Sequence, residues 1–279
     1  MVNQIVHVVG RFPPPIDGQT MATQRLADLL VPSHDVRRIS TSPEPTDHIQ
    51  ADVRFSPSRV QHYIRLRQRI RLFFHAAPTA PVLWASISPS PFGHLRDVLT
   101  VLPAFQPGQP VHAVIHWGNF DRVFRHPLTA WTARRMVRRV CRFVFLNEAL
   151  AERCAPWIPG EQRLAIPNTI DDAVRCAEDE VDAKQARCME RTAFRLLFLS
   201  NMIASKGYLD VLRAVGLLHA RGLSLHADFV GRWTSDEDRA AFERLVEEEH
   251  LGEVVTHHGG LSDRTQIKDL YLNADVFLL

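Results

Sequence analysis

The chain has 279 residues, of which 46% are hydrophobic and 23% are charged, as in soluble globular proteins with one large or two medium domains. The net charge of +2 at pH 7 is too small to indicate a nucleic-acid partner, and we expect none. The four cysteines have neither zinc-like nor redox spacing. No signal peptide precedes the first apolar run, and no apolar run is long enough to span a bilayer, so we expect a cytoplasmic protein.

Strand-like and helical segments alternate along the N-terminal half. A β-branched run at residues 5–9 predicts the first strand, a turn-rich segment follows, and an apolar stripe predicts a helix over residues 22–30. Further helices are predicted at 61–75 and around the arginines between 134 and 142. Apolar runs predict the other strands of this half, at residues 36–39, 82–85, 111–115, 143–146 and 164–166.

The same alternation starts again after the charged segment 171–191, which has few large apolar residues and is interpreted as a domain junction. The predicted strands are 196–199, 224–230, 254–257 and 276–279, and the predicted helices are 211–218, 236–249 and 263–273. Right-handed crossovers make each half a parallel, doubly wound sheet, so the predicted fold class is α/β with two Rossmann-like domains, residues 1–171 and 172–279.

The chain stops inside the apolar run DVFLL. The second sheet then has about four strands, whereas a doubly wound domain usually has about five or six. We therefore expect the second domain to be incomplete and the chain to be a C-terminally truncated fragment.

One predicted strand–loop–helix unit has polar residues suited to an anion. The strand 196–199 is closed by Ser200 and Asn201, and Lys206 and Gly207 stand where the next helix begins. Ligands of open α/β sheets bind at the carboxyl ends of the strands, and a helix N-terminus there offers unpaired N–H groups to a phosphate. An ordinary turn with a solvated lysine accounts for the same pattern.

Gly18 and His116 are candidates in the first half. Gly18 precedes a helix and permits a close approach to an anion, although a plain turn would also use glycine. The first loop has no GxGxxG pattern, which disfavours a dinucleotide-dependent oxidoreductase. His116 ends a predicted strand, where a histidine can contact a ligand or be structural. His257 and His258 are adjacent, and adjacent strand side chains face opposite ways, so we expect no metal site.

Seven segments occur in the order FPPPIDG, VIHWG, FLNEALAER, AIPNTID, LFLSNMIASKG, DFVGRW and HHGGLSDRTQIKDLYLNADVFLL. Together they resemble the retaining nucleotide-sugar glycosyltransferases of family four, which have the two-domain GT-B fold. The resemblance implies an acceptor-side N-terminal domain and a nucleotide-sugar-binding C-terminal domain. It implies a nucleoside-diphosphate sugar as donor substrate, retention of anomeric configuration, and neither a metal nor another cofactor.

The resemblance also implies roles for individual residues. His116 corresponds to the catalytic histidine that contacts the transferred sugar, and Gly18 to the glycine that approaches the diphosphate. Lys206 corresponds to the lysine of the family's basic pair, whereas the arginine position holds Asn201, which brings no charge. Gly207 belongs to the same diphosphate loop, and Gly231, in DFVGRW, to a donor-side loop.

The family's carboxylate pair lies just beyond the last predicted strand. A second interpretation is therefore an inactive truncated remnant that at most binds nucleotide or phosphate.

A basic helical segment suggests a further partner. Four arginines alternate with apolar and aromatic residues in the predicted helix 61–75, namely Arg65, Arg67, Arg69 and Arg71. They could bind an anionic membrane surface at the inner face of the cell membrane, or form a solvated face whose stems cover apolar surface. Residues 134–142 are a second candidate. Related enzymes act on glycan or lipid-linked acceptors, which suggests a role in surface or exopolysaccharide assembly.

Overall fold

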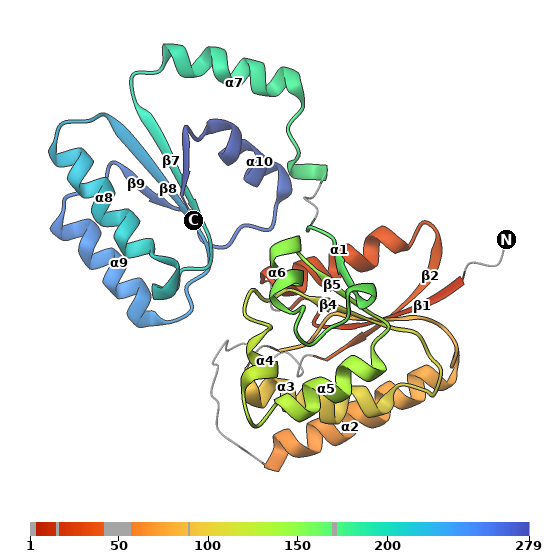
Figure 1. The fold of residues 1–279 in the computed structure, drawn as a ribbon. Helices are drawn as coiled ribbons and strands as arrows, with labels where there is room; N and C mark the ends of the chain where they lie inside the picture. The colour runs from red at the N-terminus through yellow and green to blue at the C-terminus, as the bar shows by residue number, and fades with distance from the viewer. Residues whose placement is uncertain (1–3, 15–16, 42–56, 89, 169–171, 279) are drawn as a thin grey trace. The chain divides into compact units, whose positions relative to one another are not determined.

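The structure, a computed structural model, describes residues 4–14, 17–41, 57–88, 90–168 and 172–278. It consists of two compact units, Met1–Thr169 and Ile170–Leu279 (Figure 1). The predicted boundary between residues 171 and 172 stays a prediction, because residues 169–171 lie outside the described ranges.

Unit 1 contains a six-stranded sheet with the order β2-β1-β3-β4-β5-β6. Every pair of neighbouring strands is parallel. The strands are β1 (Gln4–Gly10), β2 (His34–Ser40), β3 (Val82–Trp84), β4 (Val111–Ile115), β5 (Arg142–Phe145) and β6 (Arg163–Ala165). The parallel arrangement places the carboxyl ends of all six strands along one edge of the sheet, where loops can build a site.

Helices cover both faces of this sheet. Helix α1 (Gly18–Leu30) lies on one face, and α2 (Pro57–His75), α3 (Pro91–Thr100) and α5 (Ala130–Arg139) lie on the other (Figure 1). The core includes Phe74 of α2, Trp84 of β3 and Met136 of α5, each completely buried. Burial of one such side chain contributes about 1.5–3 kcal/mol. The remaining short helices are α4 (Arg122–Arg125), α6 (Glu148–Arg153), η1 (Leu102–Ala104) and η2 (Gly160–Gln162).

Unit 2 contains a four-stranded parallel sheet with the order β10-β7-β8-β9. The strands are β7 (Phe194–Leu199), β8 (Leu225–Val230), β9 (Val255–His257) and β10 (Val276–Leu278). Helices α8 (Tyr208–Ala220) and α9 (Asp236–Glu248) pack on one face around Phe198 and Phe229. Helix α10 (Arg264–Asn273) packs on the other face against Leu197 and Val230. The fold class predicted from the sequence is confirmed in both units.

The charged segment interpreted as a junction is largely helical, and this helix was not predicted from the sequence. After the 3-10 turn η3 (Asp172–Val174), helix α7 (Glu178–Glu190) belongs to unit 2. It is held by polar contacts: Lys268 Nζ lies 2.7 Å from Glu180 Oε1, and Lys184 donates to the carbonyl of Tyr271. Because these contacts use charged side chains, the helix lacks the apolar stripe that would have revealed it.

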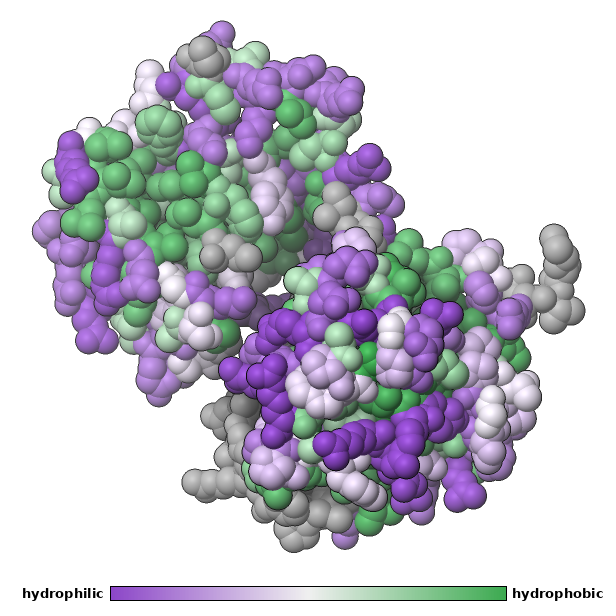
Figure 2. Space-filling model, in the orientation of Figure 1, coloured by the Kyte–Doolittle hydropathy of each residue, from purple (hydrophilic) through white to green (hydrophobic). Residues whose placement is uncertain are grey.

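Apolar side chains also reach the surface of unit 2. Hydrophobic residues gather on the face of this unit that Figure 2 shows. The exposed large apolar side chains of unit 2 are Val181, Phe194, Leu217, Leu223, Val276 and Phe277. Among the helices that the structure describes, none has the length and apolar character needed to cross a membrane.

Candidate functional site

Three loops meet at the carboxyl edge of the unit 2 sheet. The backbone N–H of Ser200, after β7, donates to the carbonyl of Val230 at 3.0 Å. Gly231, after β8, donates to the carbonyl of Gly259 at 2.9 Å. Met202 donates to the carbonyl of Arg232 at 2.9 Å. These backbone bonds hold the loops after β7, β8 and β9 together as one rigid edge.

Gly231 has a packing reason to be glycine. A Cβ atom built on Gly231 would overlap the carbonyl oxygen of Ser200. The absence of a side chain therefore allows the β7 and β8 loops to touch. This contact accounts for the glycine by itself, and the role of Gly231 in a donor-side loop stays a prediction.

Lys206 and Gly207 form the entrance of helix α8. Lys206 ends the 3-10 turn η4 (Ala204–Lys206), and Gly207 caps α8 with a φ of 73°, in the left-handed region that favours glycine. The carbonyl of Gly207 accepts from the N–H groups of Asp210 and Val211. The Lys206 side chain is exposed, and we find no ion pair for it within the described ranges. A free ammonium group thus stands beside the positive end of a helix dipole.

The first turn of α8 is anchored to α9 by a buried tyrosine. The Tyr208 side chain is completely buried, and its hydroxyl donates to Asp238 Oδ1 at 2.7 Å. Burial is the main cause that raises the pKa of Tyr208, and the hydrogen bond to Asp238 raises it further. The same hydrogen bond lowers the pKa of Asp238. The phenol therefore stays protonated and anchors α8 to α9.

The two adjacent histidines at the end of β9 face opposite sides of the sheet. His257 Nε2 lies 3.0 Å from the carbonyl oxygen of Gly231, and its ring packs on Trp233. His258 Nε2 lies 2.7 Å from Asp228 Oδ1. Within the described residues, no three side chains of His, Cys, Asp or Glu are grouped to hold a metal ion. The expected absence of a metal stays a prediction.

Gly18 is the first residue of α1, at the carboxyl edge of the unit 1 sheet. Asp17 caps this helix, accepts from the Thr20 N–H at 2.8 Å and pairs with Arg11 at 3.0 Å. A Cβ built on Gly18 would meet no atom within 4 Å. Neither packing nor a left-handed φ explains the glycine. The open surface leaves room for a ligand.

His116 follows β4 directly and lies half-buried at the same edge of unit 1. Its Nε2 atom is buried and has no hydrogen-bond partner in the described part of the chain. Burial lowers the pKa of His116, so the imidazole is neutral at pH 7. A buried, unpaired ring nitrogen is costly unless a ligand satisfies it.

The loop that carries His116 has a support that the sequence did not reveal. Arg153, at the end of α6, donates to the carbonyl of Gly118 at 2.8 Å and to Asp121 Oδ1 at 2.6 Å. Arg125 pairs with the other oxygen of Asp121 at 3.2 Å. The carboxylate of Asp121 is buried between the two arginines. Arg153 lies in the FLNEALAER segment, one of the seven segments that carry the resemblance. The sequence of that segment did not show that Arg153 contacts Gly118 and Asp121.

The structure therefore brings Asn201, Lys206, Gly207 and Gly231 to the carboxyl edge of the unit 2 sheet, and Gly18 and His116 to the carboxyl edge of the unit 1 sheet. Asn201 is half-buried, and its carbonyl accepts from the Ile203 N–H.

The profile of the family Glycosyl transferases group 1 matches residues 183–279, which lie within unit 2. This part of the chain, residues 183–279, is therefore similar to the glycosyl transferases group 1 family. The matched residues include the whole carboxyl edge described above, from Ser200 to Gly259. The match confirms the resemblance to glycosyltransferases predicted from the sequence.

Solved structures match nearly the whole chain. A sucrose-phosphate synthase from Thermosynechococcus elongatus has a TM-score of 0.66 and 15% identity, and the match covers 99% of this chain and 75% of that one. HepE from Anabaena, solved with UDP and glucose, has a TM-score of 0.62 and 12% identity, with coverage of 99% and 73%. WaaG, a glycosyltransferase involved in lipopolysaccharide biosynthesis, has a TM-score of 0.59 and 14% identity, with coverage of 98% and 74%.

At these identities the likeness establishes the fold alone, which is the GT-B fold. No curated protein matches the sequence.

Proposed function

We propose that this chain acts as a retaining, metal-independent glycosyltransferase of family four, which moves a sugar from a nucleoside-diphosphate donor to a glycan or a lipid-linked acceptor. The observation that carries the proposal is the entrance of α8 within the matched residues 183–279, where Lys206 and the helix N-terminus stand together. The solved HepE complexes, which contain UDP and UDP-glucose, are consistent with a nucleotide-sugar donor.

Sugar transfer requires stabilisation of a leaving diphosphate. The acceptor hydroxyl forms a bond to the anomeric carbon, and the bond from that carbon to the β-phosphate oxygen breaks with its electron pair going to the phosphate. The hydroxyl proton passes to an oxygen of the departing phosphate. The developing charge is stabilised by Lys206 and by the α8 dipole. Asn201 adds a hydrogen-bond donor without charge, and Gly207 lets the backbone approach the phosphate.

Two residues of unit 1 have roles of their own in the proposal. His116, neutral at pH 7, uses its unpaired Nε2 to hydrogen-bond a hydroxyl of the transferred sugar, which orients the reacting carbon. Gly18 leaves open surface for the close approach of the diphosphate. Gly231 supports the donor-side loop of unit 2 through its contact with Ser200.

The proposal also covers the localisation of the protein and the process in which its acceptor takes part. The side chains of Arg65, Arg67, Arg69 and Arg71 are exposed on α2, as binding to an anionic membrane surface requires. We propose a cytoplasmic protein that binds peripherally at the inner face of the membrane and acts in surface or exopolysaccharide assembly. The match to WaaG, whose role is in lipopolysaccharide biosynthesis, is consistent with this role.

The test is an activity assay of the purified chain with UDP-glucose, UDP-N-acetylglucosamine and GDP-mannose as donors and with lipid-extracted bacterial glycans as acceptors. The expected result is release of nucleoside diphosphate that His116→Ala reduces by about a hundredfold, the scale of a lost orienting contact. Release that is equal in the wild type and in His116→Ala would remove His116 from the mechanism. Donor binding without any release would instead indicate the remnant that only binds nucleotide.

A further inference from the structure

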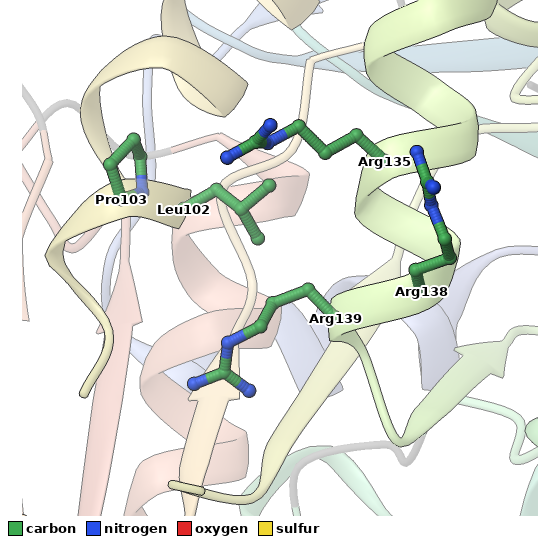
Figure 3. A pocket seen from close by; sticks show the side chains of 5 residues that line it. All are labelled: Leu102, Pro103, Arg135, Arg138 and Arg139. Carbon is green, nitrogen blue, oxygen red and sulfur yellow. The ribbon is translucent and has the colours of Figure 1, made fainter. Parts of the chain in front are cut away.

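Unit 1 has a basic hollow at the edge of the sheet opposite to His116. The hollow has a volume of about 420 Å³ and is lined by Leu102, Pro103, Arg135, Arg138 and Arg139. Figure 3 shows Arg135 extending from α5 toward Leu102 and Pro103, Arg139 extending below them, and Arg138 running alongside the helix. Three guanidinium groups and two small apolar side chains thus surround one open space.

Arg139 forms the fixed part of the hollow. Its two terminal nitrogens donate to the carbonyl oxygens of Gln109 at 2.9 Å and Gln106 at 2.6 Å, and its guanidinium lies 5.8 Å from the ring centre of Phe105. These contacts hold the loop before β4 against the end of α5. Arg139 therefore has a structural role and adds a positive charge that cannot move away.

Arg135 and Arg138 are the free part. Both side chains are exposed, and neither has a carboxylate partner within the described ranges. Arg135 lies over the ring of Trp131 at 5.9 Å from its centre, which holds the guanidinium in one orientation. Arg138 lies in the last turn of α5, where its charge stabilises the negative end of the helix dipole without using its N–H donors.

The surroundings offer no internal counter-ion. Helices α2 and α5 contain no acidic residue, and the one acid of α3, Asp97, is buried and paired with Arg96 at 2.7 Å. Unit 1 as a whole has 20 basic and 11 acidic residues, whereas unit 2 has 13 and 20. Three neighbouring guanidinium groups repel one another, and an external anion would relieve that repulsion.

The hollow is separate from the candidate active site. Arg139 contacts the residues that lead into β4 at Val111, whereas His116 follows the other end of the same strand. A ligand of the hollow would therefore not compete with the donor for His116.

We propose that the hollow between α5 and η1 binds a phosphate group, as a phosphomonoester or a diphosphate, through paired N–H donors of Arg135 and Arg138. Planar guanidinium groups match phosphate oxygens better than ammonium groups do, and all the cations here are arginines. The exposed side chains of Trp131 and Leu99, which are 63% and 57% accessible, suit a phosphate attached to an apolar chain, such as a phospholipid headgroup.

The test uses Lys206→Ala as the background, because the donor loop is itself expected to bind phosphate. Pyrophosphate binding is measured by calorimetry in this background, in its Arg135→Gln/Arg138→Gln derivative, and in an Arg221→Gln/Arg244→Gln derivative as a charge-matched control at exposed positions of unit 2. Co-sedimentation with phosphatidylcholine vesicles, with and without phosphatidic acid, is measured for the same three proteins. Circular dichroism checks that the substituted, exposed positions leave the fold intact.

The expected result is a loss of pyrophosphate affinity of about tenfold or more in the α5 derivative only. A second outcome also supports the site: none of the proteins binds pyrophosphate measurably, but the α5 derivative loses binding to phosphatidic acid. The ligand would then be the phosphate of a lipid headgroup. Equal losses in both derivatives would show a diffuse electrostatic surface and overturn the proposal. Binding that neither derivative changes, or no binding of either probe, would overturn it as well.

Discussion

Arg153 holds the His116 loop by donating to Asp121 at 2.6 Å and to the carbonyl of Gly118 at 2.8 Å. The contact with Asp121 joins α6 to the segment just after β4, and the carboxylate that accepts it is buried. Because a buried carboxylate without its partner is costly, removal of the arginine should shift the loop rather than leave it in place.

Arg153→Gln is therefore expected to lower kcat by about tenfold to a hundredfold with little change in the donor KM, because a displaced His116 misorients the sugar. The matched control is Arg125→Gln, which removes the other arginine on Asp121 but has no bond to Gly118. Steady-state kinetics of both variants provide the comparison. Similar kcat values for the two variants would contradict a positioning role of Arg153.

Gly18 and Gly231 are predicted to respond differently to the same substitution. Gly231→Ala places a Cβ into the carbonyl of Ser200 and should destabilise unit 2 by about 1–3 kcal/mol, the scale of an overpacked site. Gly18→Ala meets no atom, so its stability should stay within about 0.5 kcal/mol of wild type while the donor KM rises. Urea unfolding and donor kinetics measure the two effects. A Gly18→Ala variant with an unchanged KM would show that the diphosphate does not approach there.

Asn201→Arg should tighten binding of nucleoside diphosphate. Asn201 is uncharged, and a second cation in the loop of Lys206 would add a charge-assisted bond to the phosphate proposed to bind there. We expect an affinity gain of several-fold at low salt that shrinks as the salt concentration rises. Calorimetry with UDP at two salt concentrations tests this. An unchanged or weaker affinity would place Asn201 away from the phosphate.

Acid should destabilise unit 1 through His94. This side chain is completely buried in α3, both ring nitrogens lack a partner among the described residues, and burial lowers its pKa to about 4. Between the ordinary pKa near 6.5 and pH 4 the unfolded chain binds a proton that the folded chain does not, so stability falls as the pH falls. The shift corresponds to about 3 kcal/mol.

His94→Leu should flatten this pH dependence of urea unfolding, whereas His75→Gln, at an exposed position of the same unit, should not. If His94→Leu kept the pH dependence of unfolding of the wild type, the acid sensitivity would have to come from other groups.

The sequence predicted those features that depend on local pattern. Apolar runs located strands β1, β4, β7 and β8 within one or two residues, and Lys206 with Gly207 revealed the entrance of α8. Helix α7 was missed because its contacts with unit 2 are polar and leave no apolar stripe. The support of His116 by Arg153 was missed because it joins residues 32 positions apart in sequence through a buried carboxylate. The structure also shows why position 231 is a glycine: it contacts the carbonyl of Ser200 closely, and this contact could not be inferred from the sequence.

The arginines between 134 and 142 illustrate the same limit. The sequence grouped them on one helix, but α5 ends at Arg139 and Arg142 begins β5. Arg139 is bound to backbone carbonyls, while Arg134, Arg135 and Arg138 remain exposed. Arginines that are neighbours in the sequence therefore have different roles in the fold.

The central claim is that the entrance of α8 binds the diphosphate of the donor, and calorimetric titration with UDP and GDP tests it most directly. Wild type is compared with Lys206→Ala and with Arg213→Ala, which removes one positive charge from the exposed side of the same helix. Lys206→Ala should weaken binding by about tenfold or more, since a charge-assisted hydrogen bond contributes about 1.5–3 kcal/mol. Arg213→Ala should bind as wild type does. Equal affinities of wild type and Lys206→Ala for both nucleotides would contradict the claim.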